Sequence, residues 1–299
     1  MRRMSTRQAI HITICFTLFA VLSACLPSNT ISPTPAGTTP TVPATQPPTL
    51  IPDTPTAAPL ICLTEPGLVK QDVVPTTKPP QAFIIYLPPC YESLAGERFP
   101  VLYLLHGQTY NQDQWVRLGA PVIADRLIHA KESLPFIMVF PDDRYWNSAA
   151  GPGFGNRFIN DLIPYVDQNY RTIADREHRA LGGLSRGGGW TMQLGLEHPE
   201  LFGTLGLHSP AIFKDNAPYV ENIIQAMATE TRPNLWLDVG DSDMELARSL
   251  LLEDILTRND YPHEFYRFAG DHTEVYWSAH TETYLRWYTQ SWQEAPAAQ

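Results

Sequence analysis

Short apolar segments alternate with segments of helical periodicity from about residue 80 onward, and this alternation constrains the fold more than any other sequence feature. Several of the segments are apolar throughout, which is typical of strands in a parallel sheet covered on both faces. The predicted strands are 82–87, 101–105, 136–140, 180–184, 201–207, 235–239 and 264–268. Strands that alternate with helices over this length predict an α/β fold, a mostly parallel twisted sheet with right-handed crossovers and helices on both faces.

The segments between these strands carry the helical pattern. The predicted helices are 121–131, 158–166, 244–258 and 274–290. Pro121 fits the first turn of its helix, where a missing N–H is tolerated. Pro164 removes a backbone donor inside a helix and therefore predicts a kink.

Proline is concentrated outside this predicted sheet. The chain has 299 residues and 28 Pro, and ten of these Pro lie between residues 26 and 60. The same segment has nine Thr, one charged residue and no aromatic residue, so it has too few large apolar side chains to offset its ordering entropy. Residues 25–60 are therefore predicted to be an extended tether, or a disordered tail without a spacing role, ahead of a folded domain at 61–295.

The first 24 residues have the pattern of a secretory signal. Arg2, Arg3 and Arg7 precede an apolar run of 15 residues, which is too short to cross a bilayer. Cys25 directly follows the small residues that end this run, which resembles the lipobox of bacterial lipoproteins and implies lipid attachment at Cys25. The predicted location is the outer face of a bacterial cell membrane, with the lipid as anchor; secretion through an ordinary signal is the alternative.

Cysteine use and charge restrict the possible partners. Cys62 and Cys90 belong to the predicted domain, and in an oxidising compartment they are expected to form a disulfide rather than two buried thiols. The net charge of −10 argues against nucleic acid as the main partner, because binding phosphates requires a basic face. No motif implies a metal ion or a cofactor.

A nucleophile motif, Gly183-Leu184-Ser185-Arg186-Gly187, follows the strand 180–184 and precedes a helical segment. A sharp strand-to-helix turn exposes such a serine, and the first N–H groups of the helix can stabilise an oxyanion. The backbone N–H groups of Arg186 and Gln108 are the predicted oxyanion donors. His106, which directly follows the strand 101–105, is expected to fix that loop by hydrogen bonds, and a catalytic role is the alternative.

The carboxyl ends of two later strands supply an acid and a base in the order Ser, Asp, His. His272 follows the strand 264–268 and is the predicted general base for Ser185. Asp243 follows the strand 235–239 and is the predicted acid, with Asp241 as a helix cap or loop-fixing residue. The roles of these two aspartates could be exchanged.

These residues resemble the esterase branch of the α/β hydrolases, which includes S-formylglutathione hydrolases, feruloyl esterases, enterochelin esterases and mycolyltransferases. The matching segments are 104–107, 158–170, 183–188, 198–199, 201–203, 240–243 and 270–272, together with Trp277. The resemblance implies an α/β-hydrolase fold with Ser185, Asp243 and His272 at the triad positions. Two residues depart from the family pattern: Asp271 precedes the histidine where Gly is common, and Arg186 replaces Met or Gln.

The resemblance also bears on the shape of the site. Many relatives insert a large cap at the position of residues 209–233, and this short segment leaves no room for one, so the site is expected to be open. Arg186 is expected either to meet an anionic substrate group or to be solvated. Aromatic residues that could line the site, or simply pack, are Tyr110, Trp115, Tyr145, Trp146 and Trp277.

The signal pattern and the resemblance together predict an exported serine hydrolase that cleaves carboxylic esters, either small molecules or esters linked to a polysaccharide, through an acyl-enzyme on Ser185. Two other functions use the same residues or fold. One is acyl transfer, in which a sugar or other alcohol replaces water, as in mycolyltransferases. The other is a hydrolase fold that binds a ligand without catalysis.

Overall fold

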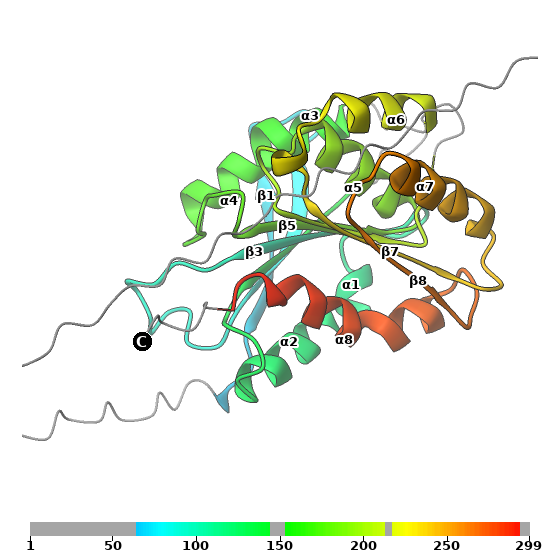
Figure 1. Ribbon diagram of the computed structural model, residues 1–299. Coiled ribbons are helices and arrows are strands. Elements are labelled where there is room, and N and C mark those ends of the chain that lie inside the picture. The colour runs from blue at the N-terminus through cyan, green and yellow to red at the C-terminus, as the bar shows by residue number, and fades with distance from the viewer. Residues whose placement is uncertain (1–63, 144–152, 213–216, 294–299) are drawn as a thin grey trace, which may run out of the picture. The chain divides into compact units, whose positions relative to one another are not determined.

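The computed structural model describes residues 64–143, 153–212 and 217–293 of the chain, all within one compact unit (Figure 1). The predicted signal (1–24), the tether (25–60) and Cys62 lie outside the described residues, as do Tyr145 and Trp146. The predicted disulfide therefore stays a prediction, although its second member, Cys90, is 8% exposed.

The described residues form one sheet with the strand order β1-β2-β4-β3-β5-β6-β7-β8. The strands are β1 (Leu68–Val74), β2 (Gln81–Leu87), β3 (Val101–Leu105), β4 (Ile137–Pro141), β5 (Arg179–Leu184), β6 (Thr204–His208), β7 (Asn234–Gly240) and β8 (Glu264–Phe268). β2 pairs antiparallel with both β1 and β4, and all other pairs are parallel. The predicted mostly parallel α/β sheet is therefore confirmed.

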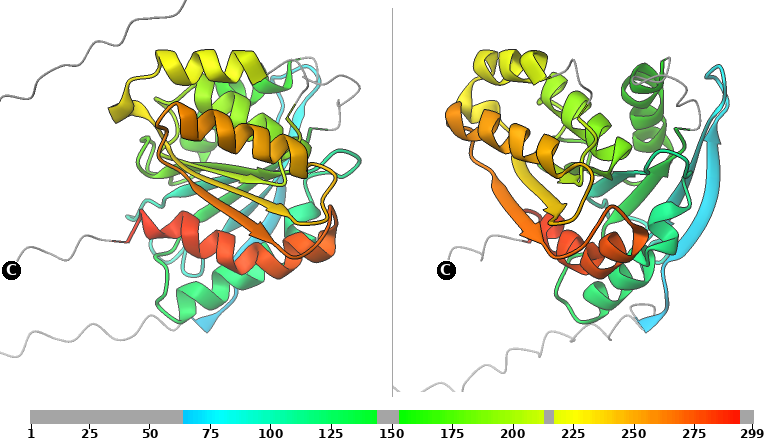
Figure 2. Two further views of the ribbon diagram at one scale, coloured as in Figure 1. Left: turned by 45° about the vertical axis from the view of Figure 1, so that its right-hand side comes forward. Right: turned by 90° about the vertical axis from the view of Figure 1, so that its right-hand side faces the viewer.

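Helices cover both faces of the sheet (Figures 1 and 2). One face carries α1 (Gln114–Arg117), α2 (Ala120–His129) and α8 (Glu274–Gln290). The other carries α3 (Phe154–Arg157), α4 (Ile163–Asn169), α5 (Arg186–Glu197), α6 (Ala217–Ala226) and α7 (Leu246–Arg258). Each face has its own cluster of buried hydrophobic residues, so both layers bury apolar surface against the strands.

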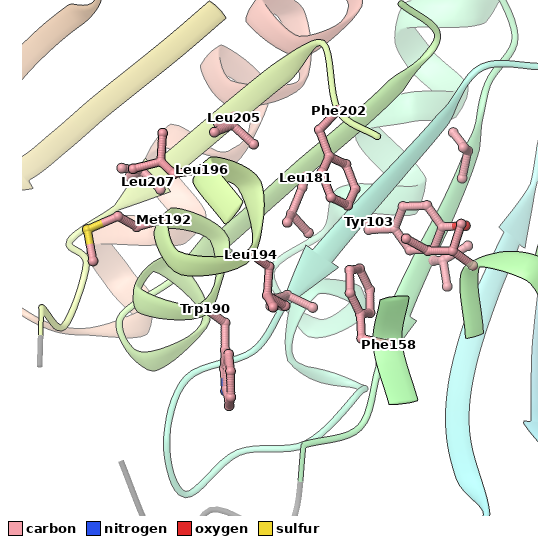
Figure 3. Packing of buried hydrophobic residues seen from close by; sticks show 14 of the residues in the cluster. Tyr103, Phe158, Leu181, Trp190, Met192, Leu194, Leu196, Phe202, Leu205 and Leu207 are labelled. Carbon is pink, nitrogen blue, oxygen red and sulfur yellow. The ribbon is translucent and has the colours of Figure 1, made fainter. Parts of the chain in front are cut away.

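The larger cluster packs helix α5 against the sheet (Figure 3). Met192, Leu194 and Leu196 of α5 are at most 3% exposed and lie with Leu205 and Leu207 of β6. This contact fixes the helix that follows Ser185 directly over the centre of the sheet.

The structure differs from the predicted elements at several boundaries. β6 starts at Thr204 instead of 201, because residues 201–203 belong to a turn in which Leu201 N–H donates to His198 O (3.0 Å). α7 begins at Leu246, because the Asp243 side chain accepts the Glu245 N–H (2.7 Å) and holds the preceding turn. β1 is not among the predicted strands, since it is an edge strand with mostly exposed residues and no continuous apolar run.

Pro164 has a local effect on the helix that contains it. A π-helical turn, η2 (Phe158–Leu162), lies directly before it, and α4 starts at Ile163 with Pro164 in its first turn. A proline cannot donate the usual i→i−4 hydrogen bond, and wider π turns are one way in which helices accommodate such a defect.

The segment between β6 and β7 is short. Its described part holds α6 and the 3-10 turn η3 (Thr229–Thr231), and no separate cap domain is present among the described residues. Among the described residues, no helix has the length and hydropathy needed to span a membrane.

A glycine in β6 sets the distance between the sheet and α8. A Cβ atom at Gly206 would overlap the hydroxyl of Tyr288, which is fully buried. We expect Gly206→Ala to lower the free energy of unfolding by about 3 kcal/mol, because overpacking a rigid core forces side chains out of their rotamers. Urea unfolding monitored by circular dichroism measures this change.

Gly96→Ala is the matched control, since no atom lies within 4 Å of a Cβ placed at Gly96. Its effect should stay within about 0.5 kcal/mol, as is usual for surface substitutions. Equal destabilisation by the two variants would contradict the close approach of α8 to β6.

Candidate active site

Ser185 lies in the tight turn between β5 and α5. Its backbone has φ 52° and ψ −118°, a conformation that is strained for any residue other than glycine. The turn requires glycines around it: a Cβ at Gly183 would overlap the backbone of Gly187, and a Cβ at Gly187 would overlap the carbonyl oxygen of Leu105. The motif identified in the sequence thus forms a strand–turn–helix elbow.

Three separate loops bring Ser185, His272 and Asp243 into one hydrogen-bonded chain. His272 Nε2 is 2.8 Å from Ser185 Oγ, and His272 Nδ1 is 2.8 Å and 3.0 Å from the two carboxylate oxygens of Asp243. With Asp243 accepting from Nδ1–H, the Nε2 atom is free to accept the Ser185 proton. This is the arrangement of a nucleophile, a general base and an orienting acid.

The Asp243 carboxylate is held in its charged form. Burial alone would raise its pKa, but the hydrogen bonds from His272 and from the Glu245 N–H hold the pKa of Asp243 below its ordinary value. A charged Asp243 at neutral pH stabilises the imidazolium that forms when His272 takes a proton.

Asp241 fixes a loop, which is one of the roles predicted for it. Its Oδ1 accepts the Gly270 N–H (3.1 Å), and its own N–H donates to Phe268 O (2.8 Å). The neighbouring Ser242 N–H donates to Gly270 O (2.9 Å). Asp241 therefore joins the loop that carries the acid to the loop that carries the base, and Asp243 is the aspartate placed against His272.

The loop after β3 passes beside the serine. A Cβ at Gly107 would lie 3.6 Å from Ser185 Cβ. The Gly107 N–H is already bonded to Gln114 Oε1 (2.8 Å), so the next N–H along the chain, that of Gln108, is the donor that this loop can offer to an oxyanion. Arg186 is the first residue of α5, where N–H groups have no partner inside the helix.

Gln114 is a site residue that the sequence analysis missed. Its side chain is fully buried, and its Nε2 donates to Glu274 Oε1 (3.2 Å) while its Oε1 holds Gly107. Glu274, two residues after His272, also pairs with Arg117 (2.8 Å). Gln114 thus connects the loop after β3 to the start of α8. Nothing in the sequence around Gln114 distinguishes it from a surface glutamine.

His106 fixes its loop, as expected. It is 3% exposed, its Nε2 accepts the Asp143 N–H (2.8 Å), and its Nδ1 lies 2.8 Å from Gly107 O. These partners require a neutral ring with the proton on Nδ1, and they leave no nitrogen for catalysis.

The Arg186 side chain was expected either to meet an anionic substrate group or to be solvated, and it does neither. It is 3% exposed, and its Nε donates to Asp143 Oδ2 (2.9 Å), which also accepts from Trp190 Nε1 (2.7 Å). Arg186 is therefore part of a buried ion pair rather than a solvated residue or a substrate contact. Both predictions failed because its burial depends on β4, which ends just before Asp143 and is remote in sequence.

Two of the predicted substrate-contacting aromatics are buried. Trp115 is 1% exposed and its indole N–H donates to Leu105 O (3.0 Å), so it supports the end of β3 from below. Trp277 is 2% exposed, and its ring packs edge-on against His272 with 4.9 Å between ring centroids. Both therefore hold the site in place instead of lining it, whereas Tyr110, at 36% exposed, is at the surface.

A metal site would require several ligating side chains close together. Within residues 64–143, 153–212 and 217–293, no group of three or more His, Cys, Asp or Glu side chains is arranged to bind one.

The chain is similar to known esterases in sequence and in fold. The family model described as "Putative esterase" matches residues 75–294. An endo-1,4-β-xylanase/feruloyl esterase of Xylanibacter ruminicola is 39% identical over 136 residues, which is 42% of this chain and 19% of that protein. A Mycobacterium tuberculosis esterase is 33% identical over 135 residues, 42% of this chain and 28% of that protein. The match therefore spans less than a third of each of these two relatives.

Solved structures share the fold over most of the chain. A ferulic acid esterase superposes with a TM-score of 0.68 at 25% identity, covering 76% of this chain and 99% of that one. An S-formylglutathione hydrolase of Staphylococcus aureus superposes with a TM-score of 0.63 at 19% identity, covering 75% and 98% of the two chains. The fold is therefore of the α/β-hydrolase type found in these esterases.

The two aspartates of the site can be separated experimentally. We expect Asp243→Asn to slow the reaction of Ser185 with a fluorophosphonate probe by about 10³-fold or more, because an amide cannot hold the His272 tautomer or stabilise its imidazolium. Asp241→Asn loses only a loop contact and should slow the reaction less than about tenfold. Labelling rates followed by mass spectrometry compare the variants, and the reverse ranking would assign the acid to Asp241.

Proposed function

This chain belongs to the Esterase family, and from that premise we propose that it is an exported serine hydrolase that cleaves carboxylic esters. The observation that carries the proposal is the continuous contact from Ser185 Oγ through His272 to Asp243, with both links at 2.8 Å. A nucleophile, base and acid in this order are what acyl transfer to a serine requires.

The reaction proceeds through two acyl-transfer steps. Ser185 Oγ attacks the ester carbonyl while His272 Nε2 takes its proton, and the N–H groups of Gln108 and Arg186 stabilise the oxyanion. The intermediate collapses to an acyl-serine as His272 gives its proton to the departing alkoxide. A water molecule then attacks the acyl-serine and loses a proton to His272. When the intermediate collapses, His272 returns this proton to Ser185 Oγ, which leaves as the free hydroxyl, and the carboxylic acid is released.

Exposed apolar side chains close in sequence to the site residues favour an ester with a large apolar portion. Tyr110, Met244 and Val275 are 36%, 76% and 80% exposed, and each lies within three residues of Gln108, Asp243 or His272. Exposed apolar side chains that gather at a site are typical of ligand contact surfaces. The names of the feruloyl esterase relatives support aromatic acyl esters, free or attached to a polysaccharide, as the substrates to test first.

The location of the enzyme is proposed from its N-terminal sequence. Residues 1–24 would direct export, lipid on Cys25 would anchor the chain at the outer face of the cell membrane, and residues 25–60 would tether the domain. Cys62 and Cys90 would form a disulfide in that oxidising compartment.

A test of catalysis combines a probe with an ester panel. The wild-type protein should react with a fluorophosphonate probe and hydrolyse feruloyl, acetyl or short-chain nitrophenyl esters. Ser185→Ala should lower turnover by about 10⁶-fold and abolish labelling, because the nucleophile is lost. Equal labelling of Ser185→Ala, or no labelling of the wild type, would favour a ligand-binding role.

Product analysis in the presence of a sugar alcohol separates the two catalytic functions. Free carboxylic acid as the main product supports hydrolysis. An acylated sugar as the main product would instead assign acyl transfer to the same triad.

The anchor is tested by a single substitution. We expect Cys25→Ser to move the protein from the membrane fraction of an expressing bacterium to its soluble or culture fraction, because the thiol that accepts the lipid is gone. Immunoblots of the fractions and the intact mass of the purified N-terminal peptide measure this change. Cys90→Ser, which leaves the lipidation motif intact, is the control and should remain in the membrane fraction; membrane retention of Cys25→Ser would exclude the lipid anchor.

A further inference from the structure

A second group of polar side chains lies beneath the site, on the face of the sheet covered by α8. Its centre is Asp238 of β7, which is fully buried. The Asp238 cluster comprises Asp238, His208, Trp236, Tyr276, Tyr284 and Tyr288. None of these residues belongs to the triad, and none is a predicted site residue.

The Asp238 carboxylate has four protein partners. Oδ1 is 2.6 Å from His208 Nδ1 and 2.7 Å from Trp236 Nε1, and Oδ2 is 2.7 Å and 2.8 Å from the hydroxyls of Tyr276 and Tyr284. Burial, followed by the charge of Asp238, raises the pKa of both tyrosines well above the ordinary value, so both hydroxyls stay protonated and donate. A buried carboxylate is tolerated only when its lone pairs are satisfied in this way.

His208 links this cluster to the nucleophile. Its ring is fixed between Asp238 and the Tyr288 hydroxyl (2.9 Å from Nε2), and its carbonyl oxygen accepts the Ser185 N–H (2.9 Å). Farther along, the Ala211 N–H donates to Ser185 O (2.9 Å). The end of β6 therefore contacts the elbow on both sides of Ser185.

Tyr276 links the cluster to the catalytic histidine. It lies four residues after His272, and a Cβ at Gly270 would come within 2.7 Å of its ring, so the ring packs directly under the histidine loop. The hydrogen bond from its hydroxyl to Asp238 fixes the ring there. Asp238 itself lies on β7, the strand that leads to Asp243.

We propose that Asp238 is a positioning residue that holds the triad in register. Its carboxylate fixes His208, whose carbonyl oxygen bonds the Ser185 N–H, and fixes Tyr276 under the His272 loop, while Asp238 itself lies on the strand that leads to Asp243. The inference rests on the proposed function, since positioning matters only if the triad is catalytic. Catalytic geometry is sensitive to such support: a misplacement of about 1 Å can cost about 10²-fold in rate.

The decisive comparison uses two tyrosines that bind the same carboxylate oxygen. Tyr276→Phe and Tyr284→Phe each remove one hydroxyl from Asp238 Oδ2 and keep an aromatic ring. We expect Tyr276→Phe to lower kcat about tenfold or more with KM within about twofold, because only Tyr276 packs under the histidine loop. Tyr284→Phe should lower kcat less than about threefold at a similar shift of the urea midpoint.

Asp238→Asn extends the test to the whole cluster. It should lower kcat and the rate of fluorophosphonate labelling together by about 10²-fold with KM little changed, because His208 and Tyr276 both lose the charged acceptor that fixes them. Tyr261→Phe is the control outside the cluster: this buried hydroxyl donates to Pro233 O (2.9 Å), and its loss should shift the urea midpoint without changing kcat.

The outcomes separate this proposal from the proposed function. If the wild type hydrolyses esters but Tyr276→Phe matches Tyr284→Phe and Tyr261→Phe in kcat, Asp238 has no positioning role and the triad stands. An increase in KM with unchanged kcat would also overturn it. If the wild type neither turns over esters nor reacts with the probe, the proposed function fails and the positioning role fails with it. Should Asp238→Asn not fold, the tyrosine variants decide.

Discussion

The turn at Ser185 is the constraint on which the rest of the site depends. A non-glycine residue with φ 52° persists there because Gly183 and Gly187, two residues before and after it, have no Cβ to collide with the backbone that they approach. Because Gly187 has no side chain, α5 can start beside the end of β3, and the loop after β3 lies next to Ser185. The carboxyl ends of β7 and β8 then need only two loops to bring an acid and a base to the same point.

Three buried aspartates near Ser185 each bind a basic side chain, and the exposure of that basic side chain distinguishes the roles of the three pairs. Asp143 holds Arg186, Asp238 holds His208, and Asp243 holds His272. His208 is fully buried and its second nitrogen is occupied by Tyr288, so it has no route to a substrate. The His272 side chain is 17% exposed and its second nitrogen faces Ser185. Of these three pairs, the one between Asp243 and His272 is therefore placed for proton transfer.

Supporting contacts beneath the site are as extensive as the site itself. Trp277 packs against His272, Gln114 joins the loop after β3 to α8, and Trp115 holds the end of β3. Such second partners restrict the motion of the residues that react, and restricted motion is what lets hydrogen-bond donors act without reorganisation during the reaction.

Local sequence determined the sheet, the elbow and the order of the triad loops. Apolar runs and helical stripes are properties of neighbouring residues, and they placed seven of the strands to within a few residues. The strand–Gly–turn motifs also identified Ser185, Asp243 and His272, since the carboxyl ends of parallel strands must meet at one edge. Family resemblance added the expectation of an open site.

Tertiary structure alone decided what surrounds those residues. The burial of Arg186 depends on an element that is distant in sequence, so its expected contact with solvent or substrate was wrong. For Trp115 and Trp277 the structure selects packing over lining the site. Gln114 and Asp238 were not predicted to be site residues, because a polar residue in a helix or a strand reveals its partners only when the chain has folded. Periodicity reports which face of an element is apolar, whereas a hydrogen-bond network is set by which elements come to lie together.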